Sequence, residues 1–239
     1  MEDFITERQK NILDSVIENY IELAHPISSK FLEEMADFGF SSATIRAEMF
    51  LLTQMGYLEQ FHISAGRIPS DRGYRFFVGN IKENKKGIPQ KIVDFLKEFK
   101  NKKNPDFDDF DNLTKEISFF SKVFTSFSFP DKKIYFENGW QFLKKEPESE
   151  QSDFWKEITC AAEEMEDLIN KMKFPENSPT IMIGDDTPFG SGKNLSFIGA
   201  PIKFEDSRCF FYLLGPKRMD YEKNLGLAES IIKIFNYGR

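Results

Sequence analysis

Three arginines in the first third of the chain stand beside small and hydroxyl-bearing residues, a combination suited to binding a polyanion. Arg46 follows the run Ser41-Ser42-Ala43-Thr44-Ile45, Arg67 follows a glycine among turn residues, and Arg75 follows a tyrosine. A guanidinium offers five N–H donors in a fixed fork that matches phosphate oxygens and the acceptor edge of guanine. These residues therefore predict a nucleic-acid surface.

The residues around Arg46 have the pattern of one short helix with a marked start and stop. Ser41 or Ser42 can cap its first turn, and Gly56 suits a left-handed ending. At about 100° per residue, one face carries Ile45, Met49 and Leu52. The opposite face carries Ala43, Arg46, Ala47, Phe50 and Gln54. We expect the first face to pack inward and the second to be presented to a ligand.

Two helices are expected before this one. Thr6-Glu7-Arg8-Gln9 has the form of a capping box, and apolar residues at helical spacing extend the first helix to about Ala24. After His25-Pro26, Ser28 or Ser29 can cap a second helix that runs to about Phe38. The close spacing of these helices predicts a helix-turn-helix.

A hairpin is expected after the presented helix. Residues 57–61 read as a strand, and residues 62–69 as a tight loop with a brief return strand. A hairpin in this position is a wing. Residues 1–80 are thus predicted to form a winged-helix DNA-binding domain.

Composition bounds the possible functions. The 239 residues are 40% hydrophobic, and no apolar run approaches the roughly 20 residues of a membrane span, so we expect a cytoplasmic protein of two domains without membrane contact. Cys160 and Cys209 lack metal-like spacing and are expected to be free, buried thiols. Only two histidines are present, and neither clustered cysteines nor a convergent pair of carboxylates is visible, so we expect no metal. We also expect no cofactor and no enzymatic activity.

Charge is distributed unevenly along the chain. Residues 1–40 carry three cations against nine carboxylates, whereas residues 82–103 carry eight cations against three. Phosphates would repel the acidic front, so DNA contact is expected only after about residue 40. The alternative is ordinary variation of surface charge. Residues 81–106 are predicted to be a basic linker with one helix over residues 92–99, which either touches phosphate or is simply solvated.

The remaining residues, 107–239, are predicted to form an α+β domain. An amphipathic stretch over residues 113–127 and a strand over residues 133–136 precede a helix over residues 153–172. Strands are expected over residues 180–183, 195–198 and 209–214, and Asp220 can cap a last helix that ends near Phe235.

Two other chemistries are disfavoured. Residues 190–194 have the glycines and lysine of a phosphate loop but the wrong spacing, and they join two expected strands, which favours a hairpin loop. Ser64, His62 and Asp71 have the residue types of a catalytic triad, but a wing tip is too exposed to exclude water from a nucleophile.

Several motifs together resemble the HrcA family of bacterial heat-shock repressors. Near the N-terminus these are Glu7-Arg8-Gln9, Ser41-Ser42-Ala43-Thr44-Ile45-Arg46, residues 56–60, and Ser64-Ala65-Gly66-Arg67-Ile68-Pro69 followed by Asp71 and Gly73-Tyr74-Arg75. Near the C-terminus, Gly215-Pro216-Lys217-Arg218-Met219-Asp220-Tyr221 resembles the family's second signature. The resemblance covers both ends of the chain, while the family's central insertion, assigned to dimerisation, is missing.

The resemblance implies a repressor that binds an inverted-repeat operator in double-stranded DNA ahead of chaperone genes, as a homodimer modulated by a GroEL-type chaperonin. It also implies that residues 107–239 form a reduced GAF-like regulatory and dimerisation domain without a ligand. The alternative function is a stress-sensing or protein-interaction module with weakened DNA binding. Ala47 departs from the family's common asparagine, so the operator can differ.

The expected DNA-binding set combines the presented helix, the wing and the residues after it. It comprises Ser41, Ser42, Ala43, Thr44, Arg46, Ala47, His62, Ser64, Ala65, Gly66, Arg67, Tyr74 and Arg75. Arg46 is expected to read guanine or clamp phosphate, the alternative being a surface salt bridge to Glu48 or to the first helix. Phe-rich residues 119–129, or the exposed faces of the last domain, are candidates for pairing two subunits. The alternative is that these phenylalanines form an intradomain core.

Overall fold

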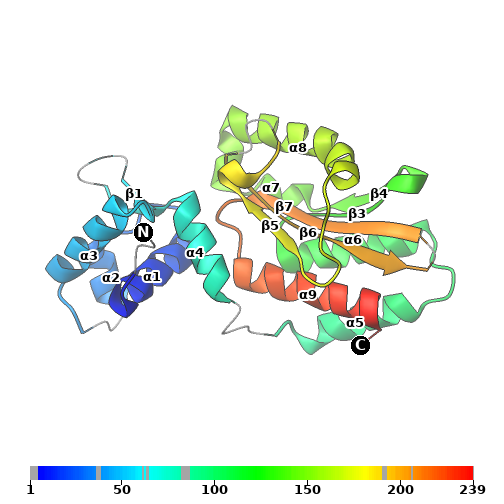
Figure 1. Ribbon diagram of the computed structural model, residues 1–239, viewed down its shortest axis with the longest axis horizontal. Helices are drawn as coiled ribbons and strands as arrows, with labels where there is room; N and C mark the ends of the chain where they lie inside the picture. The colour runs from blue at the N-terminus through cyan, green and yellow to red at the C-terminus, as the bar shows by residue number, and fades with distance from the viewer. Residues whose placement is uncertain are drawn as a thin grey trace. The chain divides into compact units, whose positions relative to one another are not determined.

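A computed structural model describes residues 5–35, 39–60, 62, 65–81, 87–189, 193–205 and 207–238. The chain divides into two compact units, Met1–Asn84 and Lys85–Arg239. Both combine helices with antiparallel strands, so the fold belongs to the mixed α+β class (Figure 1). None of the helices within the described ranges has the length and apolarity that crossing a membrane requires.

The first unit is built from short helices and a small hairpin. In chain order its described elements are α1 (Glu7–Leu23), α2 (Ser29–Met35), α3 (Ser42–Gln54), β1 (Leu58–Glu59), β2 (Ile68–Pro69) and α4 (Asp71–Ile81). The predicted capping box is present, because the Gln9 backbone donates to Thr6 Oγ1 at 3.2 Å and the Thr6 backbone donates to Gln9 Oε1 at 3.0 Å. Phe38, the predicted end of the second helix, lies outside the described residues.

The core of the first unit joins all of its helices to the hairpin. Four aliphatic residues of α1 are completely buried, and the predicted inner face of α3 is buried with them. α4 is held against the hairpin at Gly73, where a Cβ would lie 2.2 Å from the Tyr57 carbonyl oxygen. The Ser70 hydroxyl donates to the Gly56 carbonyl at 2.6 Å and accepts from the Gly73 backbone at 3.0 Å. The end of α3, the hairpin and α4 are therefore mutually fixed.

The second unit contains a five-stranded antiparallel sheet with the order β4-β3-β7-β6-β5. Its strands are β3 (Phe124–Phe129), β4 (Ile134–Asn138), β5 (Thr180–Ile183), β6 (Leu195–Phe204) and β7 (Ser207–Pro216). Its described helices are α5 (Gln90–Asn101), α6 (Phe107–Ser121), α7 (Trp140–Leu143), α8 (Ser152–Lys171) and α9 (Tyr221–Tyr237), with 3-10 turns at Pro130–Lys132, Pro147–Glu150 and Gly184–Asp186. Asp220 caps α9, as the sequence predicts.

Helices cover both faces of this sheet, with α8 on one side and α6 and α9 on the other (Figure 1). Along β3, Phe124 belongs to the cluster beneath α8, whereas Phe127 packs on Phe235 of α9 with ring centroids 6.3 Å apart. All six residues of β3 are buried for this reason. The phenylalanines of β3 thus form core on both faces of the sheet.

Several predictions about the second unit differ from the structure, and the stretch expected over residues 113–127 is divided between α6 and β3. α5 is longer than the helix expected within the linker over residues 81–106, and it packs into the second unit, where Phe99 contacts Phe110 at a centroid distance of 5.0 Å. Phe124, Phe127 and Phe129 are buried core, so they cannot pair two subunits; Phe119, in contrast, is 48% exposed. Cys209 is buried as predicted, but Cys160 is partly exposed on α8. Propensity and periodicity cannot reveal which distant surface covers a helix or strand.

Candidate nucleic-acid interface

The start of α3 is fixed by hydroxyl groups. Ser41 is the cap, because its side chain accepts from the Thr44 backbone N–H at 3.4 Å. Ser42 has a different role: its backbone donates to Glu33 Oε1 at 2.8 Å, and its hydroxyl lies 3.1 Å from the Ser29 hydroxyl. The Ser41 and Thr44 hydroxyls are 3.2 Å apart. These predicted site residues therefore position the helix as well as standing at its tip.

The outer face of α3 is presented as the sequence predicts. Ala43, Arg46, Ala47 and Gln54 are exposed, and Phe50 is 54% exposed. The opposite face is buried at Ile45, Met49 and Leu52. A helix of 13 residues is about 20 Å long. An α-helix with its side chains is about 10–12 Å in diameter, so α3 fits a major groove of about 12 Å width.

A groove of about 970 Å³ runs between α3, the hairpin and the start of α2. Its lining residues are Ile27, Ser28, Ser29, Lys30, Ala43, Arg46, Ala47, Met49, Phe50, Leu51, Gln60, Ala65, Gly66 and Arg67. Three of these lining residues, Lys30, Arg46 and Arg67, are cations. Among the described residues of the lining there is no aspartate or glutamate. Lys30 lies 3.8 Å from Glu34, but both side chains are exposed, so this ion pair is weak. The groove is suited to an anionic ligand.

The hairpin is attached to the segment before α2. Leu58 pairs with Pro69 and Glu59 with Ile68, and an isolated bridge joins Ile27 to Arg67. The two backbone hydrogen bonds of this bridge are 2.8 and 2.9 Å long. The hairpin and the segment before α2 consequently form one side of the groove.

Gly66 is required by this attachment. A Cβ at this position would lie 2.5 Å from the Ile27 carbonyl oxygen, which is too close for any other residue without a backbone shift. The sequence predicts that Gly66 allows the loop to approach DNA closely. In the structure its close approach is to the backbone of the chain itself, and its contact with DNA stays a prediction.

Arg67 is oriented by α3. Its Nε donates to the Thr53 hydroxyl at 2.9 Å, while Thr53 donates to the Met49 carbonyl at 2.8 Å. Burial lowers the pKa of Arg67, and the charge of nearby Arg46 lowers it further. Two like charges held close together repel one another, and a bound anion relieves that repulsion.

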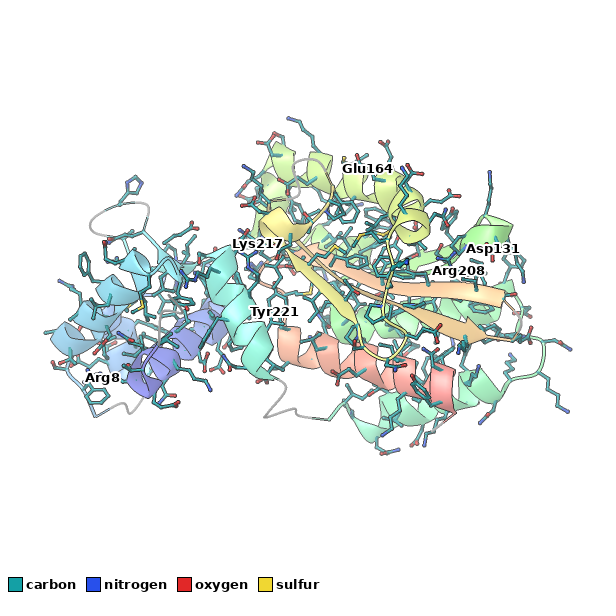
Figure 2. The ribbon with its side chains drawn as sticks, viewed as in Figure 1. Arg8, Asp131, Glu164, Arg208, Lys217 and Tyr221 are labelled. Atoms are coloured by element: carbon teal, nitrogen blue, oxygen red, sulfur yellow. The ribbon has the colours of Figure 1, made fainter. Side chains whose placement is uncertain are left out.

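A buried network sets the rotation of α3 about its axis. Glu48, 6% exposed, accepts from Arg8 at 2.6 Å and from the Gln9 side-chain amide at 3.0 Å. Arg8, labelled in Figure 2, also lies over the ring of Phe40. The Glu48 carboxylate therefore faces α1. The alternative in which Glu48 pairs with Arg46 does not describe this structure.

The remaining predicted site residues differ in how far they are exposed. His62 and Arg75 are exposed and Ala65 is half-buried, whereas Ser64 lies outside the described residues. Tyr74 is 1% exposed in the core of α4, so its side chain cannot reach DNA, and the prediction that it belongs to the site is wrong. The periodicity of α4 places Tyr74 beside buried Phe77 and Val78, a signal that could have excluded it.

Sequence reasoning missed several residues that build the groove. Ile27 holds the hairpin, Thr53 holds Arg67, and Lys30 and Gln60 line the groove. Gln60 also donates to the Ala65 carbonyl at 3.0 Å across the base of the loop. No local pattern marks these residues, because each acts on a segment distant in sequence or across a turn.

The two units define a class: mixed α+β proteins in which a small helical unit with a hairpin presents a cationic helix face, followed by a larger unit with an antiparallel sheet. The family model described as "HrcA protein C terminal domain" matches residues 79–225. Since this match covers more than half of the sequence, the chain belongs to the HrcA family.

Named relatives agree with this assignment. The "Heat-inducible transcription repressor HrcA" of Brevibacillus brevis is 52% identical over 77 residues, which are 32% of this chain and 23% of that protein. The protein of the same name from Acetivibrio thermocellus is 39% identical over 134 residues, which are 54% of this chain and 37% of that protein. These matches therefore span well under half the length of either relative.

One solved structure shows the same fold over almost the whole chain. It is a crystal structure of a hypothetical protein, with a TM-score of 0.72 and 18% sequence identity, and the match covers 96% of each chain. The similarity concerns the fold alone, because the sequences are only distantly alike.

Proposed function

We propose that this chain is a DNA-binding transcriptional repressor of heat-shock genes, which acts at an inverted-repeat operator ahead of chaperone genes. In this proposal residues 1–80 form a winged helix-turn-helix, with α3 as the recognition helix and the hairpin as the wing. The second unit is a reduced GAF-like regulatory domain. The names of the relatives support the role, and the groove beside α3 supports the mode of binding.

The observation that carries the proposal is the cationic groove between α3 and the hairpin. Arg46 stands one turn into the exposed face of α3, where helix-turn-helix proteins place residues that read the major groove. Arg67 is held beside it at the base of the wing, where a cation can meet phosphate or the minor groove. Base reading and backbone clamping can thus occur side by side.

Arg46→Ala tests the proposal. The probes are a duplex containing the inverted repeat found upstream of the organism's own chaperone genes and a scrambled duplex of equal composition, and binding is measured by fluorescence anisotropy at one fixed salt concentration. If Arg46 reads a base, the variant should lose about 1 to 3 kcal/mol of affinity for the repeat and accept changes at one base position. Circular dichroism should be unchanged.

Lys156→Ala is the matched control, since it also removes one exposed charge but lies on α8. It should bind the repeat as the parent chain does. Unchanged affinity of Arg46→Ala would remove this residue from the site. Equal affinity of the parent chain for both duplexes would favour the alternative, an interaction module with weakened DNA binding.

The proposal includes a homodimer, because one recognition helix covers only a half-site and an inverted repeat needs two helices about one DNA turn, ~34 Å, or a multiple of that apart. Light scattering of the full chain at micromolar concentration should give twice the chain mass. A chain that stays monomeric even on the repeat would contradict this mechanism. Modulation by a GroEL-type chaperonin belongs to the same proposal and should appear as a changed affinity for the repeat when chaperonin is added.

A further inference from the structure

The exposed face of α3 carries an apolar strip beside Arg46. Ala43, Ala47 and Phe50 follow one another at i, i+4 and i+7, and all three are exposed. Leu51, 44% exposed, also lines the groove. A lone exposed apolar side chain needs no explanation, but a contiguous strip on a face that also carries a cation does.

Resting on the proposed function, we propose that this strip contacts the 5-methyl groups of thymines that flank the base read by Arg46. The thymine methyl is the one apolar group that base pairs present in the major groove, and alanine and phenylalanine are suited to contact it. The half-site would therefore carry thymines on either side of a guanine.

The dimensions of the helix agree with this assignment. At about 1.5 Å per residue, Ala43 and Phe50 are roughly 10 Å apart along the axis. At about 3.4 Å per base, that distance spans about three base pairs. Arg46 lies between the two ends of the strip, so the guanine and its thymines should fall within one run of about three to four base pairs.

Ala47 gives the strip its selectivity. Its methyl group has no hydrogen-bonding capacity, so at this position the helix can distinguish bases only by apolar contact. Its small size also lets α3 approach the groove floor closely, which brings Phe50 and Arg46 to the base edges. A polar side chain here would instead read adenine or cytosine through hydrogen bonds.

The test starts from a randomised duplex library, so it does not depend on a known operator sequence. Duplexes are selected with the full chain, and each thymine of the winning sequence is then replaced singly by deoxyuridine, which lacks only the methyl group. At two or three thymines beside the guanine, the dissociation constant should rise about fourfold, the factor expected for burying one methyl group. Deoxyuridine elsewhere should have no effect.

Phe50→Ala and Phe50→Leu connect the effect to the strip. Phe50→Ala should bind more weakly and become insensitive to deoxyuridine at one thymine, whereas Phe50→Leu, which keeps an apolar side chain, should stay sensitive. Tight binding that ignores every deoxyuridine would overturn the inference and leave the repressor proposal standing. Failure to enrich any duplex would count against the repressor function itself, and this inference would fall with it.

Discussion

The Nε of Arg67 donates a hydrogen bond to Oγ1 of Thr53 across 14 positions of sequence, at 2.9 Å. This contact connects the base of the hairpin to the last turn of α3. A cation that would otherwise sample many rotamers is thereby held at the edge of the groove. Ordering of this kind lowers the entropic cost of binding.

Thr53→Val should weaken DNA binding without removing any charge. Valine keeps the volume of threonine but cannot accept from Arg67, so the guanidinium loses its orientation. We expect a loss of about 0.5 to 1.5 kcal/mol of binding free energy, the usual contribution of one hydrogen bond. Thr53→Ser keeps the hydroxyl and should bind nearly as the parent. Equal anisotropy titrations for Thr53→Val and the parent chain would show that this contact does not matter for binding.

Arg67→Ala should weaken binding to all duplex sequences alike. If Arg67 neutralises one phosphate, the slope of log affinity against log salt should become shallower by about one unit. Lys171→Ala, on α8 and paired with Asp167, is the control with an unchanged slope. A lower melting temperature combined with an unchanged slope would assign Arg67 to hairpin stability alone.

Asp14→Asn should stabilise the first unit at neutral pH. Asp14 Oδ1 is buried without a hydrogen-bond partner among the described residues, and burial raises the pKa of this carboxyl to about 6. Lys10 lowers this pKa while Glu18 and Glu7 raise it. Ionising the partly buried Asp14 carboxyl lowers the free energy of unfolding, because the charge is not compensated by a hydrogen bond at Oδ1. The neutral amide of the Asp14→Asn variant avoids this cost.

The sign of the pH dependence follows from the raised pKa. Between about pH 4 and pH 6 the folded chain binds more protons at Asp14 than the unfolded chain, so the free energy of unfolding falls as pH rises through this window. At pH 7 Asp14→Asn should gain about 1 to 2 kcal/mol, a discounted value because the carboxyl is partly solvated. At about pH 4 the gain should vanish. Hydrogen exchange of the α1 amides would measure this gain in the free energy of unfolding. A gain that does not depend on pH would contradict its attribution to the ionised Asp14 carboxyl.

Arg218→Gln should destabilise the second unit. Arg218 donates to Glu148 Oε1 at 2.7 Å and to Oε2 at 3.0 Å, and it also pairs with Glu146. Its side chain is only 9% exposed. Removing the cation leaves two carboxylates facing one another, and burial already raises the pKa of Glu146. A cost of about 3 kcal/mol is expected at neutral pH.

Arg218→Lys is the matched variant, since it keeps the charge but loses the bidentate fork, and its cost should be clearly smaller. Tryptophan fluorescence during urea unfolding would report on this unit, because Trp155 donates to the Ser149 carbonyl beside the same segment at 2.8 Å. An equal loss of unfolding free energy in the two variants would show that the charge of Arg218 contributes nothing to its interaction with Glu146 and Glu148.

The sequence alone determined the local features of both units. Thr6 and Asp220 cap their helices, and the inner face of α3 is buried at Ile45, Met49 and Leu52, as their patterns predict. Helix caps and periodic apolar faces depend on residues within one or two helical turns of each other, so they can be predicted from a short stretch of sequence. Four of the five strands of the second unit were also predicted, although β6 continues to Phe204, beyond the predicted strand. β3 (Phe124–Phe129) was not predicted as a strand, because its residues were included in the amphipathic stretch over residues 113–127.

Tertiary structure decided which of those local features meet. Gly66 serves the Ile27 backbone, Glu48 faces Arg8, and Tyr74 points into the core. α5 became part of the second unit only because distant aromatic rings cover Phe99. Each outcome depends on surfaces separated by many residues, whose pairing is selected by the burial of apolar area and by the satisfaction of buried polar groups. The order of residues along the chain does not by itself identify these tertiary partners.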